Sequence, residues 1–339
     1  MHLIQSIRNY LELCRIQYAG FGILCVIGAM TVVGEELTWM QFLPLFAVHV
    51  LTIAWSFAHN DYCDYEIDRH GEDLSRRVIV RGDISRRSAL IFAMVIFATS
   101  LFITVIAWPG LLPAGLLIMI GALVVLYNRV SKRFVGTDAL FATAGMLFVV
   151  LGAVSAIPDH DPTLIPALTW IVVAITFLDL FNFNAVLGGF KDLVSDKEQG
   201  CRTLAGKFTE VDSDGRLTVS TGFKVVAMSG TLLMIALIFL PFLVLPYPSI
   251  QWQIEAMAFL GVVTVFYTWK FLNVRQFDRE LIGELAGKRE FASNMLRLFM
   301  FVSWIGIIWT LYLMAMGAAI LVLFNVFIYG HPFRTPSAY

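Results

Sequence analysis

Two short stretches of the sequence gather acidic side chains at a regular spacing. In the first, Asn60, Asp64 and Asp68 are four residues apart, so on a helix they would lie along one face. In the second, Asp192 and Asp196 have the same spacing. Carboxylates gathered in this way repel one another unless a cation lies between them. The pattern therefore indicates either a cation site or two ordinary, solvated, charged helix ends.

An oxygen-only ligand set of this kind favours a hard cation. Mg²⁺ usually binds one or two carboxylates together with phosphate oxygens and keeps several waters. The four cysteines show no CxxC pairing and no histidine at metal-ligand spacing, so a zinc site is not indicated. We therefore predict that two facing clusters hold a diphosphate through Mg²⁺, with Mn²⁺ as the alternative ion. The predicted metal ligands are Asn60, Asp64, Asp68, Asp192 and Asp196.

The elements that must position these acids are membrane helices. Of the 339 residues, 58% are hydrophobic and 14% charged, and the mean hydropathy is +0.77. A soluble chain carries about 25% charged residues. This composition excludes a disordered chain, a disulfide-stapled miniprotein and an ordinary cytosolic domain, and a net charge of −1 gives no attraction to nucleic acid. We predict an all-α, polytopic membrane bundle that forms a single integral-membrane domain over residues 1–339.

About nine stretches are long and apolar enough to cross a bilayer. Proline and glycine separate several of them, as at Pro109-Gly110, Pro158 and Pro246. The predicted spans are residues 17–34, 40–59, 88–108, 111–127, 137–156, 164–187, 222–245, 253–272 and 298–320.

The basic residues orient these spans. If nine spans alternate, one side receives the N-terminus and the segments 60–87, 128–136, 188–224 and 270–297, which together carry 23 of the 24 Lys and Arg residues. The positive-inside rule then predicts a cell-membrane protein with the N-terminus and both acidic clusters in the cytoplasm and the C-terminus outside. No charged residue lies between Arg297 and Arg334, so either one long helix or a tight helical pair fits there, and we favour the single span.

The acidic clusters resemble the paired motifs of a known family. Asn60-x-x-x-Asp64-x-x-x-Asp68 and Asp192-x-x-x-Asp196 are similar to the two acidic motifs of the UbiA superfamily of intramembrane prenyltransferases. The run from Tyr127 to Lys132 resembles the Tyr…Lys motif of that family, and Gly200-Cys-Arg-Thr-Leu204 resembles its Gly-x-x-Thr-Leu stretch. The resemblance covers nearly the whole chain.

The resemblance implies a reaction and roles for particular residues. Family members transfer a prenyl group from an isoprenyl diphosphate to a hydrophobic or amphipathic acceptor among membrane lipids, and their acidic motifs bind Mg²⁺ and the donor diphosphate. On this basis the catalytic residues are Asp64, Asp68, Asp192 and Asp196. The candidate diphosphate ligands are the cations Lys132, Arg77, Arg69, Arg15 and Arg202, of which Lys132 and Arg77 match family motifs.

The acceptor pocket is the least defined part of this hypothesis. Asp179 lies inside the sixth span, where a charge costs about 2.5–3.5 kcal/mol, so its side chain is expected to face the bundle interior. It either lines the acceptor cavity or is a hydrogen-bonded packing residue. The candidate acceptor residues are Asp61, Tyr127, Asp179, Asn184 and Arg81.

Two departures from the family pattern leave the identity of the acceptor open. Many members have Arg-Pro-Ile-Pro-Ser-Gly where this chain has Arg77-Val-Ile-Val-Arg-Gly82, and some have Asp where it has Gly189. Family acceptors include aromatic acids of the quinone type, chlorophyllides, haem and glycerol-phosphate lipids. The run from Asp64 to Arg69 is closest to members that make archaeal ether lipids or prenylated aromatics.

Two other functions compete with prenyl transfer. A terpene cyclase of the same superfamily would capture the cation with a double bond of its own substrate. A cation transporter typically places charges near the midplane and shows repeat symmetry, whereas these acids lie at the ends of spans and no clear repeat is seen. A CDP-alcohol phosphotransferase is not indicated because its DGxxAR signature is absent.

Overall fold

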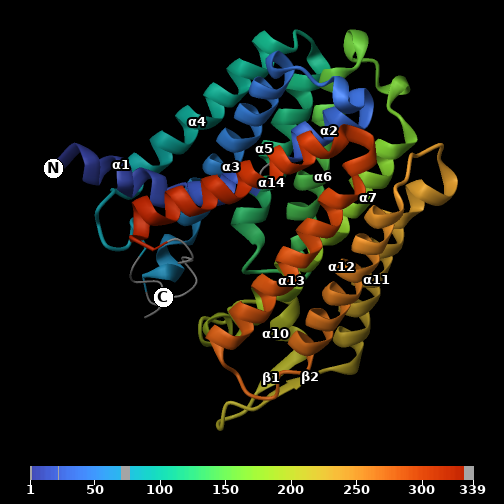
Figure 1. Ribbon diagram of the computed structural model, residues 1–339. Coiled ribbons are helices and arrows are strands. Elements are labelled where there is room, and N and C mark those ends of the chain that lie inside the picture. Colours follow the sequence, from blue (N-terminus) through green and yellow to red (C-terminus); the bar gives the residue numbers. More distant parts are fainter. Residues whose placement is uncertain (1, 22, 70–76, 332–339) are drawn as a thin grey trace. The chain divides into compact units, whose positions relative to one another are not determined.

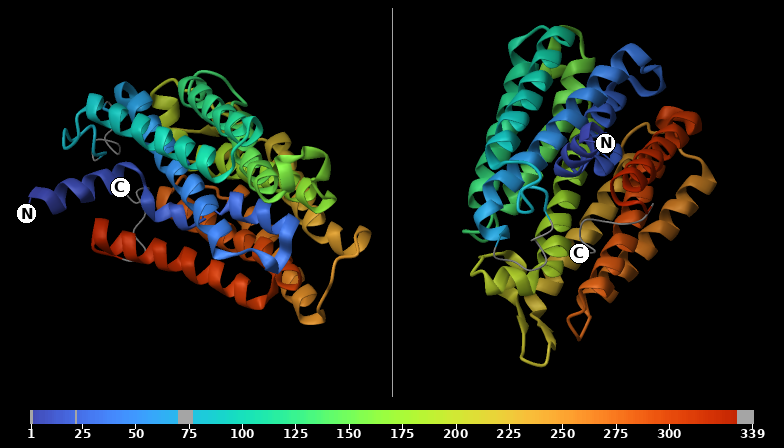
Figure 2. Two further views of the ribbon diagram at one scale, coloured as in Figure 1. Left: turned by 90° about the horizontal axis from the view of Figure 1, so that it is seen from above. Right: turned by 90° about the vertical axis from the view of Figure 1, so that its left-hand side faces the viewer.

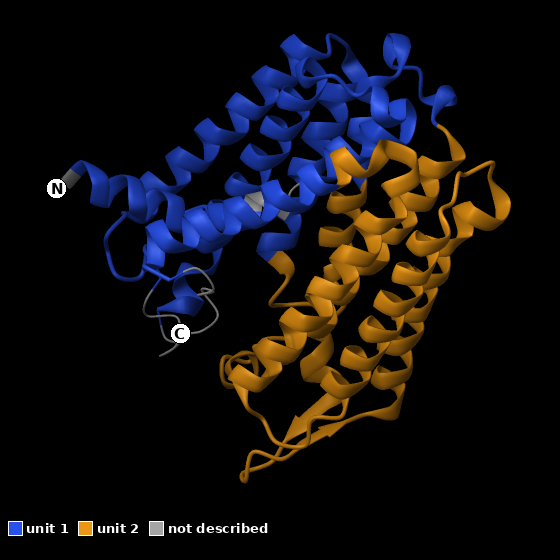
Figure 3. Ribbon diagram, in the orientation of Figure 1, with its two compact units in different colours: residues 1–129, 147–165, 311–339 blue, residues 130–146, 166–310 orange. Residues whose placement is uncertain are grey.

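The computed structural model describes residues 2–21, 23–69 and 77–331. Among these residues, eight helices are long and apolar enough to cross a membrane, so the predicted all-α polytopic architecture is confirmed. The chain forms two compact units, which Figure 3 shows in blue and orange. Unit 1 contains residues 1–129, 147–165 and 311–339, and unit 2 contains residues 130–146 and 166–310.

The described residues of unit 1 contain helices and no strand (Figure 1). Its longest helix, α3 (Trp39–Asp68), begins with a capping box in which Thr38 and Gln41 each bond the other's backbone N–H. The other elements are α1 (His2–Leu13), η1 (Ile16–Phe21), α2 (Leu24–Val33), η2 (Gly34–Glu36), α4 (Arg86–Ala107), α5 (Leu111–Val130), η4 (Pro158–His160), η5 (Pro162–Leu164) and the later parts of α6 (Asp138–Ala156) and α14 (Val302–Tyr329).

Polar side chains join α3 to α4. The hydroxyls of Thr52 and Ser100 lie 2.8 Å apart, and Ser100 also donates to the Val48 carbonyl at 3.2 Å. One turn further along, the rings of Trp55 and Phe97 pack with their centroids 4.5 Å apart. Helices in lipid gain little from burying apolar surface against each other, so such hydrogen bonds and close contacts hold them together. They fix the end of α3 that carries the first acidic motif.

Glycines let α2 and α6 touch backbone to backbone. A Cβ at Gly28 would overlap the Val149 carbonyl oxygen, and a Cβ at Gly152 would overlap the Cys25 carbonyl oxygen. The contact is reciprocal, because each helix supplies one glycine and one carbonyl. Small residues of this kind are typical of closely packed membrane helices.

Unit 2 combines four long helices with a small polar extension. In Figure 2 the extension, a yellow hairpin, projects past the helix ends of this unit. The elements are α7 (Ala167–Phe181), the π-helical η6 (Asn182–Gly188), α8 (Gly189–Lys191), α9 (Leu193–Glu198), α10 (Leu204–Phe208), β1 (Thr209–Val211), β2 (Leu217–Val219), α11 (Thr221–Val244), α12 (Gln251–Leu272) and α13 (Arg279–Met300), with the first parts of α6 and α14. The strands pair antiparallel, with Glu210 opposite Thr218.

A buried apolar cluster anchors the hairpin end of unit 2. Phe190 and Leu193, which lie on either side of Asp192 in the sequence, are both fully buried in it. They pack with Phe271 of α12 and Ile282 of α13. The backbone that carries Asp192 is therefore held by apolar contacts on both sides of this residue.

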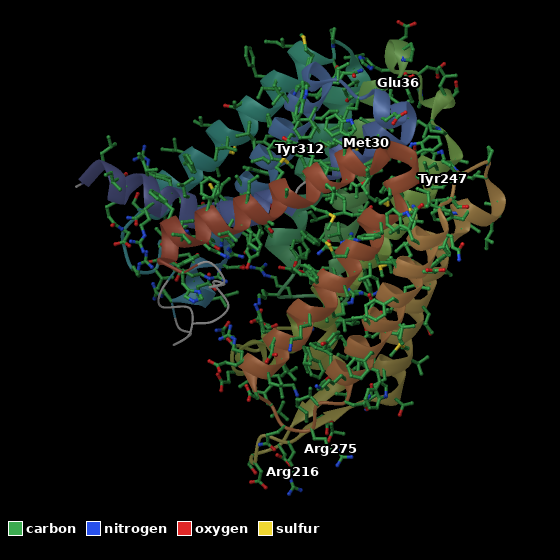
Figure 4. The ribbon with its side chains drawn as sticks, viewed as in Figure 1. Met30, Glu36, Arg216, Tyr247, Arg275 and Tyr312 are labelled. Atoms are coloured by element: carbon green, nitrogen blue, oxygen red, sulfur yellow. The ribbon has the colours of Figure 1, made fainter. Side chains whose placement is uncertain are left out.

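Helix α13 corrects the predicted span boundaries. Residues 270–297 were predicted as a cytoplasmic segment and 298–320 as the ninth span, but residues 279–300 form one helix. Its far end lies beside Tyr247, whose hydroxyl donates to the Met300 carbonyl at 2.9 Å, whereas Arg275 precedes its start. Figure 4 shows Tyr247 and Arg275 at opposite ends of unit 2, so α13 runs the length of this unit. Hydropathy missed it because α13 is rich in charged residues.

The two ends of the chain also differ from prediction. The predicted first span, 17–34, is not one helix, since η1 ends at Phe21 and α2 begins at Leu24. In unit 1, Tyr312 of α14 packs on Trp39 at the start of α3, with ring centroids 5.1 Å apart, whereas Tyr329 lies close to Glu12 and Tyr18. The C-terminus was predicted to lie on the side opposite the N-terminus, and within unit 1 the described end of α14 lies close to the N-terminal segment.

Candidate functional site

The first acidic motif occupies the last turns of α3, in unit 1. The helix continues to Asp68, so Asn60, Asp64 and Asp68 lie along one face as the spacing predicted. Asp64 and Asp68 are buried, and the Asn60 amide donates to Asp64 at 3.1 Å. Asn60 also donates to Asn128 of α5 at 3.4 Å. The motif is thus a set of largely desolvated oxygen ligands, supported by a neighbouring helix.

Two arginines from different parts of unit 1 meet Asp68 of this motif and the neighbouring Asp61, which the sequence placed in the acceptor pocket. Arg15 donates to Asp61 at 2.7 Å, and Arg77 bonds both Asp61, at 3.1 Å, and Asp68. The Arg15 guanidinium also stacks over the Phe57 ring, 4.8 Å from its centroid. These pairs offset the charge that burial leaves on the acids, and they place two of the predicted diphosphate ligands at the first motif.

The segment that departs from the family's proline-containing pattern forms a tight turn that holds Arg77. The Arg81 N–H donates to the Arg77 carbonyl at 2.8 Å, and the Asp83 N–H donates to the Val78 carbonyl at 3.1 Å. Val78 and Ile79 are buried beneath the turn. Apolar packing and local hydrogen bonds thus fix this backbone in place of the two prolines.

The second acidic motif lies in unit 2, where the chain changes from α8 to α9 at Asp192. Lys132 donates to Asp196 at 2.6 Å, and Arg279 donates to Asp192 at 3.1 Å. Lys191 lies 3.8 Å from Asp192. Burial raises the pKa of the Asp196 carboxyl above its ordinary value, and the adjacent Lys132 ammonium opposes that rise. Each carboxylate of the motif therefore meets a cation from a distant part of the chain.

The small residue at position 189 has a packing explanation. A Cβ at Gly189 would lie 3.1 Å from the Cβ of Ala205 in α10. A larger side chain at this position would require Ala205 to shift by a few tenths of an ångström. The close approach of α8 to α10 therefore favours a small residue at this position.

Asp179 is held by three residues of α13. Arg289, Ser293 and Arg297 are spaced four apart, and all three reach the Asp179 carboxylate, at 3.5, 3.1 and 2.6 Å. Asp179 and Arg289 are almost fully buried. The structure therefore shows a paired carboxylate between α7 and α13, which supports a packing role rather than an acceptor-lining role for Asp179.

Other residues singled out in the sequence lie apart from the motif carboxylates or contact other partners. Arg69 pairs with exposed Glu66, and Arg81 pairs with Glu12 and Asp83. Asn184 donates to Asp138 at 2.8 Å. The Arg202 side chain is exposed and Tyr127 is half-buried on α5.

Sequence reasoning missed two residues of these clusters, Arg279 and Asn128. A cation in the first turn of a helix is unfavourable because the macrodipole places positive charge there. Arg279 is the first residue of α13, so this mismatch was a signal that it pairs with an acid elsewhere. Asn128 lies inside the Tyr…Lys run, directly after Tyr127, which was chosen as an acceptor candidate.

The acids fit a hard divalent cation. Across the described ranges, no group of three His, Cys, Asp or Glu side chains is arranged to hold a metal by itself. Mg²⁺ does not need such a group, because it takes one or two carboxylates and completes its shell with phosphate oxygens and water. Buried Asp64 and Asp68 in unit 1, and Asp192 and Asp196 in unit 2, supply that chemistry.

The chain was compared with models of known protein families. Residues 21–289 match the UbiA prenyltransferase family. The chain belongs to this family. The match ends within α13, so α14 lies beyond it.

Two UbiA homologues of known structure share the fold. A digeranylgeranylglyceryl phosphate synthase superposes with a TM-score of 0.66, at 17% identity, over 89% of this chain and 99% of that chain. A UbiA homologue from Archaeoglobus fulgidus, solved with geranyl diphosphate (GPP) and Mg²⁺, superposes with a TM-score of 0.59, at 17% identity, over 87% of this chain and 99% of that chain.

A curated relative has the same name as the first of these structures. The digeranylgeranylglyceryl phosphate synthase of Methanococcoides burtonii is 27% identical over 163 residues, which are 47% of this chain and 54% of that protein. The chain thus spans about half the length of this relative.

Proposed function

We propose that this UbiA family member transfers a prenyl group from an isoprenyl diphosphate to a lipid acceptor within the membrane. The observation that carries the proposal is the double pairing at the second motif, where Lys132 meets Asp196 and Arg279 meets Asp192. A diphosphate needs both cations and metal-binding carboxylates, and here both kinds of group are already gathered at one place.

Divalent metal would be held in unit 1 by Asn60, Asp64 and Asp68, and in unit 2 by Asp192 and Asp196. Mg²⁺, or Mn²⁺ in its place, would neutralise the charge that develops on the departing diphosphate. Lys132 and Arg77 would bind the phosphate oxygens by charge-assisted hydrogen bonds, which are stronger than neutral ones. Both side chains already lie on motif carboxylates.

The reaction breaks the allylic C–O bond of the donor, and both bonding electrons leave with the diphosphate. The acceptor oxygen forms the new C–O bond and loses its proton. Apolar helices around the prenyl chain would exclude water, which otherwise competes for the cation-like carbon. The acids and cations described above act on the diphosphate end alone.

The acceptor we favour is a glyceryl phosphate lipid that carries one prenyl chain. The support is the name shared by the Methanococcoides burtonii relative and one superposed structure. Such an acceptor is amphipathic, so its phosphate would stay near the charged end of the protein while its chain lies among the helices.

We also propose that the N-terminus, both motifs and the C-terminus face the cytoplasm. The distribution of Lys and Arg supports the first three, and the position of Tyr329 near Glu12 supports the last. A reporter enzyme that works only in the cytoplasm should then be active when it is fused after Tyr339.

The deciding experiment is turnover with purified protein. Labelled geranylgeranyl diphosphate is incubated with Mg²⁺ and either a monoprenylated glyceryl phosphate or an aromatic acid, and the Asp192→Asn variant is the control. We expect a diprenylated lipid from the first mixture only. Label appearing in a cyclic hydrocarbon without any acceptor would instead identify a terpene cyclase, and no consumption of donor by folded protein would overturn the proposal.

A further inference from the structure

A second cation of unit 2, Arg279, lies at the second motif in the same way as Lys132. Its guanidinium is half-buried and donates to Asp192 at 3.1 Å, although the two residues are 87 positions apart. Asp192 itself is more exposed than Asp196, so its carboxylate and the arginine on it are open to an incoming ligand.

The position of Arg279 depends on the short segment 273–278 before α13. The Leu217 N–H donates to the Arg275 carbonyl at 2.8 Å, and the Phe277 N–H donates to the Gly215 carbonyl at 2.8 Å. The Gln276 side chain donates to the Asp214 carbonyl at 2.7 Å. This segment thus forms an extra edge on the β1–β2 hairpin.

Two further contacts fix where α13 begins. Asp278 caps the helix by accepting from the Leu281 N–H at 3.0 Å. Phe277 packs against the buried apolar cluster that also contains Phe190 and Leu193. The hairpin, the cap and the cluster therefore hold Arg279 beside Asp192.

We propose that Arg279 binds the donor diphosphate. The inference rests on the proposed function, because it requires an isoprenyl diphosphate at the second motif. The guanidinium presents a planar fork of N–H donors that matches phosphate oxygens better than an ammonium does. The Asp192 carboxylate would then be available to hold the metal ion, and the Arg279 guanidinium would bind the phosphate oxygens. Until then, Arg279 neutralises Asp192.

The test measures binding of a non-cleavable donor, geranylgeranyl thiolodiphosphate, to the full chain with Mg²⁺. Arg279→Ala should weaken this binding about tenfold or more, the effect of losing a charged hydrogen bond. Arg279→Lys should give an intermediate value, because it keeps the charge and loses the fork. The matched control is Arg275→Ala, since Arg275 is exposed four residues earlier and contributes only its backbone carbonyl to the hairpin (Figure 4).

A second variant tests the role of the hairpin. Asp212 accepts from the N–H groups of Asp214 and Arg216 in the turn, so Asp212→Ala should loosen the hairpin and weaken donor binding less than Arg279→Ala does. Combining both changes should add little to Arg279→Ala alone. For Arg279→Ala, steady-state kinetics should show a raised KM for the donor and an unchanged KM for the acceptor.

The results distinguish a failure of the role of Arg279 from a failure of the proposed prenyl transfer. If wild-type protein binds the analogue and Arg279→Ala binds it equally well, Arg279 is not a donor ligand, and the proposed function stands. If wild-type protein does not bind the analogue at all, the proposed function itself fails. An equal loss of donor and acceptor binding in Arg279→Ala would show a general structural role and would also overturn the inference.

Discussion

The backbone N–H of Arg202 donates to the carbonyl of Lys132 at 3.0 Å. This bond joins the loop before α6 to the stretch after the second acidic motif, two segments that resemble separate family motifs in the sequence. It holds the Lys132 backbone beside the chain that carries Asp196. The ion pair between their side chains is therefore built on a fixed backbone contact.

Lys132→Ala should lower kcat/KM for the donor about tenfold or more, because a charge-assisted contact to phosphate is lost. The protein should remain folded, since the Arg202–Lys132 backbone bond survives the change. Steady-state kinetics with purified protein give the measurement. Arg133→Ala is the control, as Arg133 is exposed and adjacent. Similar losses in both variants would mean that only the charge of the loop matters.

Chelation of divalent cations should abolish turnover without unfolding the protein. Asp61, Asp68, Asp192 and Asp196 each have an arginine or lysine partner, so their charge is offset without a metal. Activity and Tm in detergent are measured with and without EDTA, and Mg²⁺ is then restored. A large fall in Tm on chelation would show that the metal is structural.

Asp179→Asn should destabilise the protein by less than the roughly 3–5 kcal/mol of an uncompensated buried charge, because Arg289 and Arg297 lose their carboxylate on α7 while Arg289 keeps its pair with Glu290. Thermal unfolding in detergent gives the measurement. Lys288→Ala is the control, since Lys288 is exposed beside Arg289. A raised acceptor KM with unchanged stability would instead support the acceptor-lining role.

Gly189→Asp should also destabilise, by about 1–3 kcal/mol, since the new side chain meets Ala205. Adding Ala205→Gly should recover part of the loss, because it removes the methyl group that the new side chain strikes. Unfolding of the single and double variants is compared. If Gly189→Asp is as stable as wild type, the packing explanation for this departure fails.

Local patterns predicted much of the fold and of the first motif. Asn60, Asp64 and Asp68 lie on one face because a helix fixes what is four residues apart, whatever surrounds it. Most predicted spans correspond to helices for a similar reason, since apolar length alone makes a segment stable in lipid. Lys132 was identified because the run from Tyr127 to Lys132 resembles a motif of the family.

What the sequence did not reveal depends on partners far along the chain. The charges of Arg289 and Arg297 led to the prediction that this part of the chain is a cytoplasmic segment. A hydropathy scale treats every charged side chain as exposed, whereas both arginines are paired with Asp179. Arg279 was missed because its partner, Asp192, lies 87 positions away in the chain. The first span contains Gly20, which favours an interruption, yet its apolar length suggested one helix.

The backbone contact between α2 and α6 affects how this part of the protein responds when lipid is exchanged for detergent. Gly28 and Gly152 bring carbonyl oxygens against Cα atoms, so the fit there depends on shape and not on exclusion of water. Shape does not change when lipid is exchanged for detergent. This part of unit 1 should therefore stay intact during solubilisation, when contacts that rely on the thickness or composition of the bilayer are lost.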